Sequence, residues 1–191
     1  TSYNDQITGN NKANSIDAGS GNDTLDGGID SEIDILQGNS GNDIFILRAD
    51  SGVDVINGGD DIDTVDYSSL TSSQNLTLTL NSSAGTTATI IDGTSTYTDS
   101  IENIENIKSG AGKDILIGSD VNNTILSGAG NDTLSGGKGN DYLDGGNDND
   151  TVDYTYVTSG TGVNVNLTLN TASDMFIDTD KQVGNDQIFN I

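Results

Sequence analysis

A nine-residue period is the feature that most constrains how this chain can fold. Between Ser109 and Asp153, five nonapeptides follow one another without insertion: SGAGKDILI, GSDVNNTIL, SGAGNDTLS, GGKGNDYLD and GGNDNDTVD. Their sixth position is aspartate in four copies, and their eighth position is always aliphatic. A fixed period of this kind predicts a solenoid in which each repeat contacts only its neighbours.

An earlier block follows the same template less strictly over residues 1–66. Its clearest copies are AGSGNDTLD at 18–26, GNSGNDIFI at 38–46 and GGDDIDTVD at 58–66. Degenerate or lengthened copies lie between them, and the extra residues around Ile29 to Glu32 predict a widened turn.

The repeat GGxGxDxUx, in which U is aliphatic, can be interpreted residue by residue. Glycines at positions one, two and four permit the positive φ angles of a tight turn. Residues seven to nine form a short strand with one inward aliphatic side chain, so that two repeats make one coil. The aspartate of one repeat then approaches the aspartate two repeats later. Ca²⁺ would convert this repulsion into a bond, since it accepts about six to eight oxygen ligands in flexible geometry.

Threonine-rich segments follow each block. In residues 67–108, Leu76, Leu78 and Leu80 alternate with threonine, which predicts β-strands, and no stretch shows a helical period. We therefore expect an all-β chain with a first roll block at 1–66 and a strand segment at 67–108 that packs on or caps the roll. A second roll block is expected at 109–153. Residues 154–191 are expected to form a second such segment leading into a truncated repeat.

Composition restricts the function. Thirty acidic residues against six basic ones give a net charge of −24, which argues against nucleic acid as a partner. Hydrophobic residues make up 31%, too few to offset the entropy of folding easily, and without cysteine no disulfide can help. No apolar run suggests membrane insertion. Without histidine, cysteine, HExxH or GxSxG, the chain is not expected to be an enzyme.

These nonapeptides resemble the repeats-in-toxin (RTX) family of bacterial type I secreted proteins. The resemblance implies a right-handed parallel β-roll (β-solenoid) that binds several Ca²⁺ ions and folds when it meets extracellular calcium. It further implies a Gram-negative source, the type I secretion machinery as a partner, and an extracellular or cell-surface location. Self-association, or contact with neighbouring domains of one large chain, is also compatible with it.

The family's ligand role falls here on position-six side chains and on turn carbonyls. The metal-site residues expected on this basis are Gly19, Gly21, Asp23, Asp34, Gly38, Gly41, Asp43, Asp54, Gly59, Asp63, Gly110, Gly112, Asp114, Asn123, Gly128, Gly130, Asp132, Gly137, Gly139, Asp141, Gly146, Asp148 and Asp150. Weaker or missing ions are expected where Asn14 or Asn123 replaces the aspartate. The same is expected where Asp61, Asp148 or Val121 replaces the glycine at position four, and Val121 should be strained there.

Three kinds of parent protein fit such a fragment. The favoured one is a large adhesin or surface-layer protein in which calcium-rigidified modules act as structural elements, because two similar modules follow each other in tandem. The alternatives are the secretion and folding domain that follows a catalytic domain of a protease, lipase or epimerase, and an RTX toxin.

Overall fold

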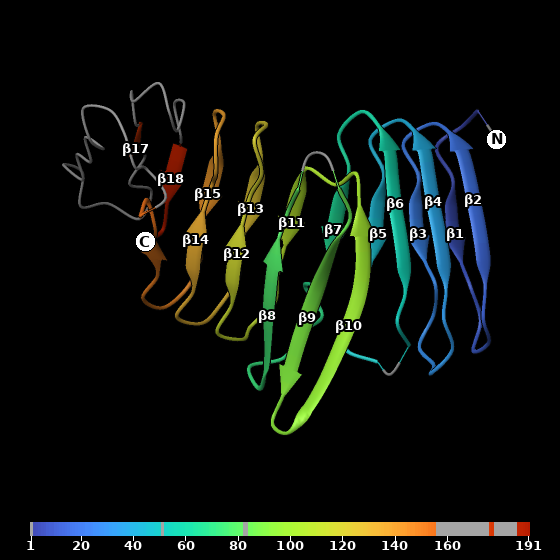
Figure 1. Cartoon of the computed structure of the whole chain (residues 1–191), viewed down its shortest axis with the longest axis horizontal. Helices are drawn as coiled ribbons and strands as arrows, with labels where there is room; N and C mark the ends of the chain where they lie inside the picture. The colour runs from blue at the N-terminus through green and yellow to red at the C-terminus, as the bar shows by residue number, and fades with distance from the viewer. Residues whose placement is uncertain (1, 51, 82–83, 156–175, 178–186) are drawn as a thin grey trace.

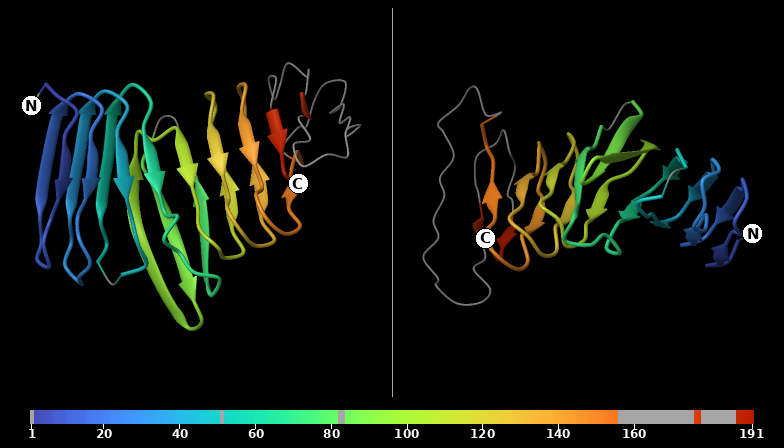
Figure 2. Two further views of the ribbon diagram at one scale, coloured as in Figure 1. Left: turned by 180° about the vertical axis from the view of Figure 1, so that it is seen from behind. Right: turned by 90° about the horizontal axis from the view of Figure 1, so that it is seen from below.

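The computed structural model describes residues 2–50, 52–81, 84–155, 176–177 and 187–191, and all secondary structure in these ranges is β. Two sheets of stacked strands face each other and form an elongated roll (Figures 1 and 2). The prediction of an all-β parallel roll is therefore confirmed. In the described residues there is no helix of the length and apolarity needed to cross a membrane.

The first sheet runs from one end of the roll to the other. In spatial order it contains β1 (Gln6–Thr8), β3 (Thr24–Asp26), β5 (Ile44–Ile46), β7 (Thr64–Asp66), β11 (Asn106–Lys108), β13 (Thr124–Leu126), β15 (Tyr142–Asp144), β18 (Gln187–Phe189) and β17 (Phe176–Ile177). Its pairs are parallel except for β17 with β18.

The second sheet lies opposite and includes strands of six to eight residues. In spatial order it contains β2 (Ser15–Ser20), β4 (Ile35–Ser40), β6 (Val55–Asp60), β10 (Ser95–Glu102), β9 (Thr86–Asp92), β8 (Gln74–Thr79), β12 (Ile115–Ile117), β14 (Thr133–Ser135) and β16 (Thr151–Val152). The β8–β9 and β9–β10 pairs are antiparallel, while the other pairs are parallel.

Coil length follows the spacing of the repeats. Thr124 pairs with Tyr142, one coil of two nonapeptides later, and neighbouring turns there are related by 18 residues. Thr24 instead pairs with Ile44, and the related turns lie 20 residues apart. The extra residues around Ile29 to Glu32 thus lengthen a turn without shifting the strands, as the sequence predicts.

The core is a row of aliphatic and aromatic side chains enclosed between the sheets. The three-residue repeat strands inside the roll bury their central side chain, as Leu25, Phe45 and Val65 show with no exposed surface, whereas Ile7 of the terminal strand β1 is only partly buried. Because every second strand residue faces outward, a single large side chain per strand is all that the narrow interior admits.

Residues 67–108 contribute strands to both sheets. The meander of β8, β9 and β10 occupies the second sheet between β6 and β12, and β11 continues the first sheet between β7 and β13. The β9–β10 hairpin extends beyond the edge of the roll (Figure 1). Of the segment expected at 154–191, residues 156–175 and 178–186 lie outside the described residues, while β18 stacks on β15.

Candidate metal sites in the turns

Turns along the two long edges of the roll bring the position-six residues into rows. We call edge one the side on which the chain passes from the second sheet to the first, at the top of Figure 1, and edge two the opposite side. Each position-six residue directly precedes a strand, as Asp43 precedes β5 and Asp132 precedes β14. Strand pairing therefore fixes the spacing of these side chains along each edge.

On edge one, each carboxylate accepts a hydrogen bond from the backbone of the preceding coil. The N–H of Asp5 donates to Asp23 Oδ1 at 2.7 Å, that of Asp23 to Asp43 at 2.7 Å, and that of Asp43 to Asp63 at 2.8 Å. The row continues at Glu105, whose Oε2 accepts a hydrogen bond from the N–H of Asp63 at 2.9 Å. Further along, the N–H of Asn123 donates to Asp141 Oδ1 at 2.8 Å.

Edge two carries the same ladder. The N–H of Asn14 donates to Asp34 at 2.8 Å, and that of Asp34 to Asp54 at 2.9 Å. In the second block, Asp114 donates to Asp132 at 2.8 Å and Asp132 to Asp150 at 2.9 Å. The structure therefore brings the position-six residues expected from the sequence into two rows.

One oxygen of many of these carboxylates has no proton donor. Asp43 and Asp63 are fully buried, yet within the described part of the chain their Oδ2 atoms accept no hydrogen bond. The same holds for Oδ2 of Asp23, Asp132 and Asp150 in the rows, and for that of Asp30 in the widened turn. A buried anionic oxygen without a partner is costly, so each of these atoms is placed to interact with a positive charge.

Glycine serves two different purposes in the turns. Gly59 at position two and Gly41 at position four have φ angles of 109° and 115°, as the sequence predicts. The expected turn glycines with positive φ are Gly19, Gly21, Gly41, Gly59, Gly128, Gly130, Gly137, Gly139 and Gly146. Gly38, Gly110 and Gly112 do not have positive φ, so the prediction fails for them.

At position one the reason for glycine is space. A Cβ on Gly38 would meet Oδ2 of Asp43 and the carbonyl oxygen of Gly58 in the next coil. Two oxygen acceptors therefore border the same small space, and neither can donate a proton to the other. Such a pair suits a cation bound between coils.

Burial and mutual repulsion raise the pKa of carboxyl groups in these rows. Burial first, and then the charges of Asp43 and Glu105, raise the pKa of Asp63 to about 7. Burial raises that of Asp114 to about 6, although the Ser109 hydroxyl donates to it at 2.5 Å. Asp26 lies outside the rows and pairs with Arg48 at 2.6 Å, which lowers its pKa. A bound divalent cation would give the carboxylates of the rows the neighbouring positive charge that Arg48 gives to Asp26.

The departures from the repeat behave in different ways. Asp61 and Asp148 keep the positive φ of position four, at 79° and 81°. Val121 does not adopt a positive φ, so the expected strain there is wrong. Its turn is closed differently, because the N–H of Ser119 donates to Asn123 Oδ1 at 2.6 Å. The Nδ2 of Asn123 donates to the Glu105 carbonyl at 2.6 Å, so this side chain is satisfied without an ion.

Several members of the rows were missed from the sequence. Asp5 and Glu105 belong to edge one, and counting one coil of 18 residues back from Asp23 and from Asn123 would have found both. Asp99 extends edge two, since it accepts from the Asp54 N–H at 3.3 Å and from the Tyr67 hydroxyl at 2.7 Å. It lies outside any repeat, and no spacing signal identifies it.

Position five forms a further ladder that runs in the opposite direction. The N–H of Asn42 donates to Asn22 Oδ1 at 3.0 Å, and that of Asn140 to Asn122 at 2.8 Å. This explains why asparagine so often precedes the aspartate in the repeat. The turns are thus held to their neighbours on both sides before any ion is considered.

The donor set fits calcium better than a transition metal. It consists of carboxylates and backbone carbonyls, which are the ligands of hard cations. In the described ranges, no three acidic side chains form a ready-made metal cluster. Carbonyls would therefore have to provide much of the coordination. The carboxylates that could contribute are those of Asp23, Asp43 and Asp63 on edge one and of Asp114, Asp132 and Asp150 on edge two.

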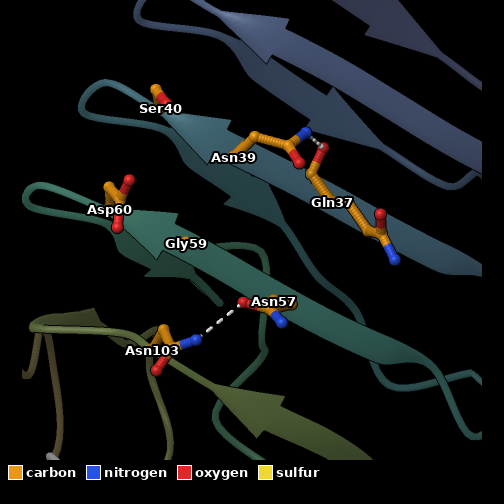
Figure 3. A pocket seen from close by; sticks show the side chains of 7 residues that line it. All are labelled: Gln37, Asn39, Ser40, Asn57, Gly59, Asp60 and Asn103. Carbon is orange, nitrogen blue, oxygen red and sulfur yellow. Dashed lines mark hydrogen bonds between the residues drawn. The ribbon is translucent and has the colours of Figure 1, made fainter.

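An open hollow of about 420 Å³ on the outer face of the roll has a different chemistry. It is lined by Gln37, Asn39, Ser40, Asn57, Gly59, Asp60 and Asn103 (Figure 3). Amides and a hydroxyl predominate there, with one carboxylate. It is therefore not a candidate for the ion sites.

Comparison with known families agrees with this geometry. A family model of the RTX calcium-binding nonapeptide repeat matches four times, at residues 1–31, 30–65, 106–125 and 117–152. This chain belongs to the RTX calcium-binding repeat family. The comparison with curated proteins found no match to the chain. The RTX matches leave out residues 66–105, which include the meander and Glu105.

Proposed function

We propose that this RTX chain binds several Ca²⁺ ions along both edges and folds when it binds them. The rows of carboxylates repel each other in the folded state, and the core alone is thin. Calcium removes that repulsion and links each coil to the next, so that its binding energy becomes folding energy.

The single observation that carries this proposal is the set of buried Oδ2 atoms without a donor, typified by Asp43 and Asp63. On edge one they occur in the successive coils of Asp23, Asp43 and Asp63, and on edge two in those of Asp132 and Asp150, each at position six of a repeat. A solvated acidic face would not bury them.

The test is calcium titration of the chain followed by circular dichroism and small-angle X-ray scattering. We expect a largely unfolded chain in calcium-free buffer and a compact, elongated β-rich one at millimolar Ca²⁺, with a cooperative transition. Magnesium at the same concentration should be much less effective, because it requires a smaller and stricter octahedron. Identical spectra with and without calcium would refute the proposal.

For the parent protein, we propose a rigid structural module of a secreted adhesin or surface-layer protein. The elongated roll supports this, because the described chain enters at one end and leaves at the other (Figure 2). We also propose export through the type I machinery of a Gram-negative bacterium, which membership of the RTX family supports. A secretion domain attached to an enzyme, or a toxin, is the alternative. The domains encoded beside this segment would distinguish them, since a catalytic domain upstream would contradict the structural role.

A further inference from the structure

A short turn outside the repeats continues the row on edge one. The N–H of Asp63 donates to Glu105 Oε2 at 2.9 Å, and the N–H of Glu105 donates back to the Asp63 carbonyl at 3.2 Å. Glu105 therefore occupies the place of a position-six aspartate, although the matched repeats end at residue 65 and resume at 106. The glutamate has the same charge and one more methylene.

Asn103 completes the likeness to a repeat turn. It has a φ of 53°, and its Nδ2 donates to Asn57 Oδ1 at 2.9 Å (Figure 3). A Cβ on Gly58 would meet the Asn103 carbonyl oxygen and Asp63 Oδ2 together. In the preceding coil, a Cβ on Gly38 would likewise meet a backbone carbonyl oxygen, that of Gly58, together with Asp43 Oδ2. Asn103 thus supplies the carbonyl that a repeat would supply.

The charges around Asp63 are not balanced by the protein. Asp63 is fully buried, and its Oδ2 accepts no hydrogen bond in the described part of the chain. The carboxylates of Asp43, Glu105 and Asp61 all act on it, in addition to burial. Neither nearby basic residue neutralises it, because Lys108, the cation nearest in sequence to Glu105, pairs with Asp66 at 3.0 Å, and Arg48 pairs with Asp26.

We propose that Glu105 is a calcium ligand, and that Asp63, Glu105 and the Asn103 carbonyl form a calcium site between the first repeat block and the inserted meander. This inference rests on the proposed calcium-dependent function. Between Glu105 and Asn123, the next residue of the row, no ion is needed, because the side-chain amide of Asn123 donates a hydrogen bond to the Glu105 carbonyl. The ion therefore lies on the Asp63 side of Glu105. Binding there would couple the first block to β10 and β11, which flank the short turn.

Glu105→Gln tests the charge separately from the hydrogen bond. Glutamine keeps an oxygen that can accept from the Asp63 N–H, but it removes the carboxylate. Glu102→Gln is the matched control, because Glu102 is exposed at the end of β10 and loses the same charge. Ions bound per chain would be counted by native mass spectrometry, and the midpoint of calcium-induced folding by circular dichroism.

We expect Glu105→Gln to bind one Ca²⁺ fewer than the wild type and to need several-fold more calcium to fold, while Glu102→Gln matches the wild type. Equal ion counts and midpoints for the two variants would overturn the inference. If Glu105→Gln does not fold, Glu105→Asp decides: recovery of folding shows that charge is required, and failure shows that it is not. A wild-type chain that binds no calcium would instead refute the proposed function.

Discussion

The repeat coils and the inserted meander are stabilised in different ways within the same roll. The repeat strands β3, β5 and β7 have three residues each and bury one side chain, and the six-residue repeat strand β4 buries Leu36 as its one large apolar side chain. The meander strands β8, β9 and β10 have six, seven and eight residues. The meander buries several apolar side chains, among them Leu76, Leu78 and Ile90, which have no exposed surface. The repeats instead place their buried polar groups in the turns.

The difference indicates that the repeat coils depend mainly on calcium for their stability, whereas the meander depends mainly on the burial of apolar side chains. Burying a large aliphatic side chain contributes about 1.5–3 kcal/mol, so a strand with one such residue gains little. The coils need the ions in their turns, while the meander gains more from its own core. The dependence of unfolding free energy on calcium concentration can separate the two, because its slope reports the number of ions released.

The largest effect is expected from Ile90→Ala in the meander. Ile90 is fully buried, so the cavity should cost about 2–5 kcal/mol of unfolding free energy at saturating calcium. The slope against the logarithm of calcium concentration should stay unchanged, since no ligand is lost. Chemical denaturation at several calcium concentrations measures both quantities. The adjacent Ile91 faces outward and is 44% exposed, so Ile91→Ala should have little effect; equal losses would refute this division.

Asp132→Ala should instead change the calcium dependence. The substitution removes the acceptor of the Asp114 N–H and a buried carboxylate, which costs about 1.5–3 kcal/mol for a hydrogen bond to a charged group. The calcium midpoint should rise and the slope should fall. Asp120→Ala is the control, because Asp120 lies outside position six and its side chain pairs with Lys138 while exposed. Equal midpoints for the two variants would contradict the assignment of position six.

The sequence period was sufficient for the roll and for most of the rows. Asp23, Asp43, Asp114 and Asp132 could be predicted because a fixed period and the alternation of a strand determine which side chains share an edge. The extra residues near Ile29 could be assigned to a turn for the same reason: a change within the strand would have turned the core residues outward.

The pairing of the meander could not be predicted. The Leu and Thr alternation in residues 76–80 predicts a strand but does not identify its partner, and the order β10, β9, β8 depends on contacts between distant residues. Asp99 joins edge two through this pairing alone. The place of Glu105 in the row was predictable from the coil length of 18 residues, but the repeat pattern expects aspartate or asparagine there, not glutamate. The absence of strain at Val121 depends on a turn closed by a side chain, which the repeat pattern does not describe.

The pH dependence should reverse between the calcium-free and calcium-bound chain. The pKa values of Asp63 and Asp99 are raised to about 7 and those of Asp50 and Asp114 to about 6, from an ordinary value of 3.8. Without calcium, the folded state therefore binds more protons than the unfolded state, and its stability is lost as pH rises from about 4 to 7. Calcium requires the ionised carboxylates, so its stabilising effect should grow with pH over the same window.

Folding at pH 5 and pH 8 in calcium-depleted and calcium-saturated buffer, followed by circular dichroism, measures this reversal. Dialysis should remove the calcium, because the affinity of chelators itself changes with pH. A calcium-dependent gain in stability that is equal at both pH values would show that the carboxylates of the rows, such as Asp63 and Asp114, do not hold the ions.

The smallest effect is expected from Gly93→Ala at the tip of the β9–β10 hairpin. Gly93 has a φ of 60°, but a Cβ there would meet nothing within 4 Å. Only the backbone conformation should therefore matter, at about 1 kcal/mol, with an unchanged calcium slope. Gly41 also has positive φ, yet a Cβ on it would meet the Gly21 carbonyl in the preceding turn. Gly41→Ala should therefore disturb a carbonyl beside the ion row and raise the calcium midpoint. If Gly93→Ala raised the midpoint as much as Gly41→Ala, the meander would depend on calcium as the coils do, and the division between the two regions would be wrong.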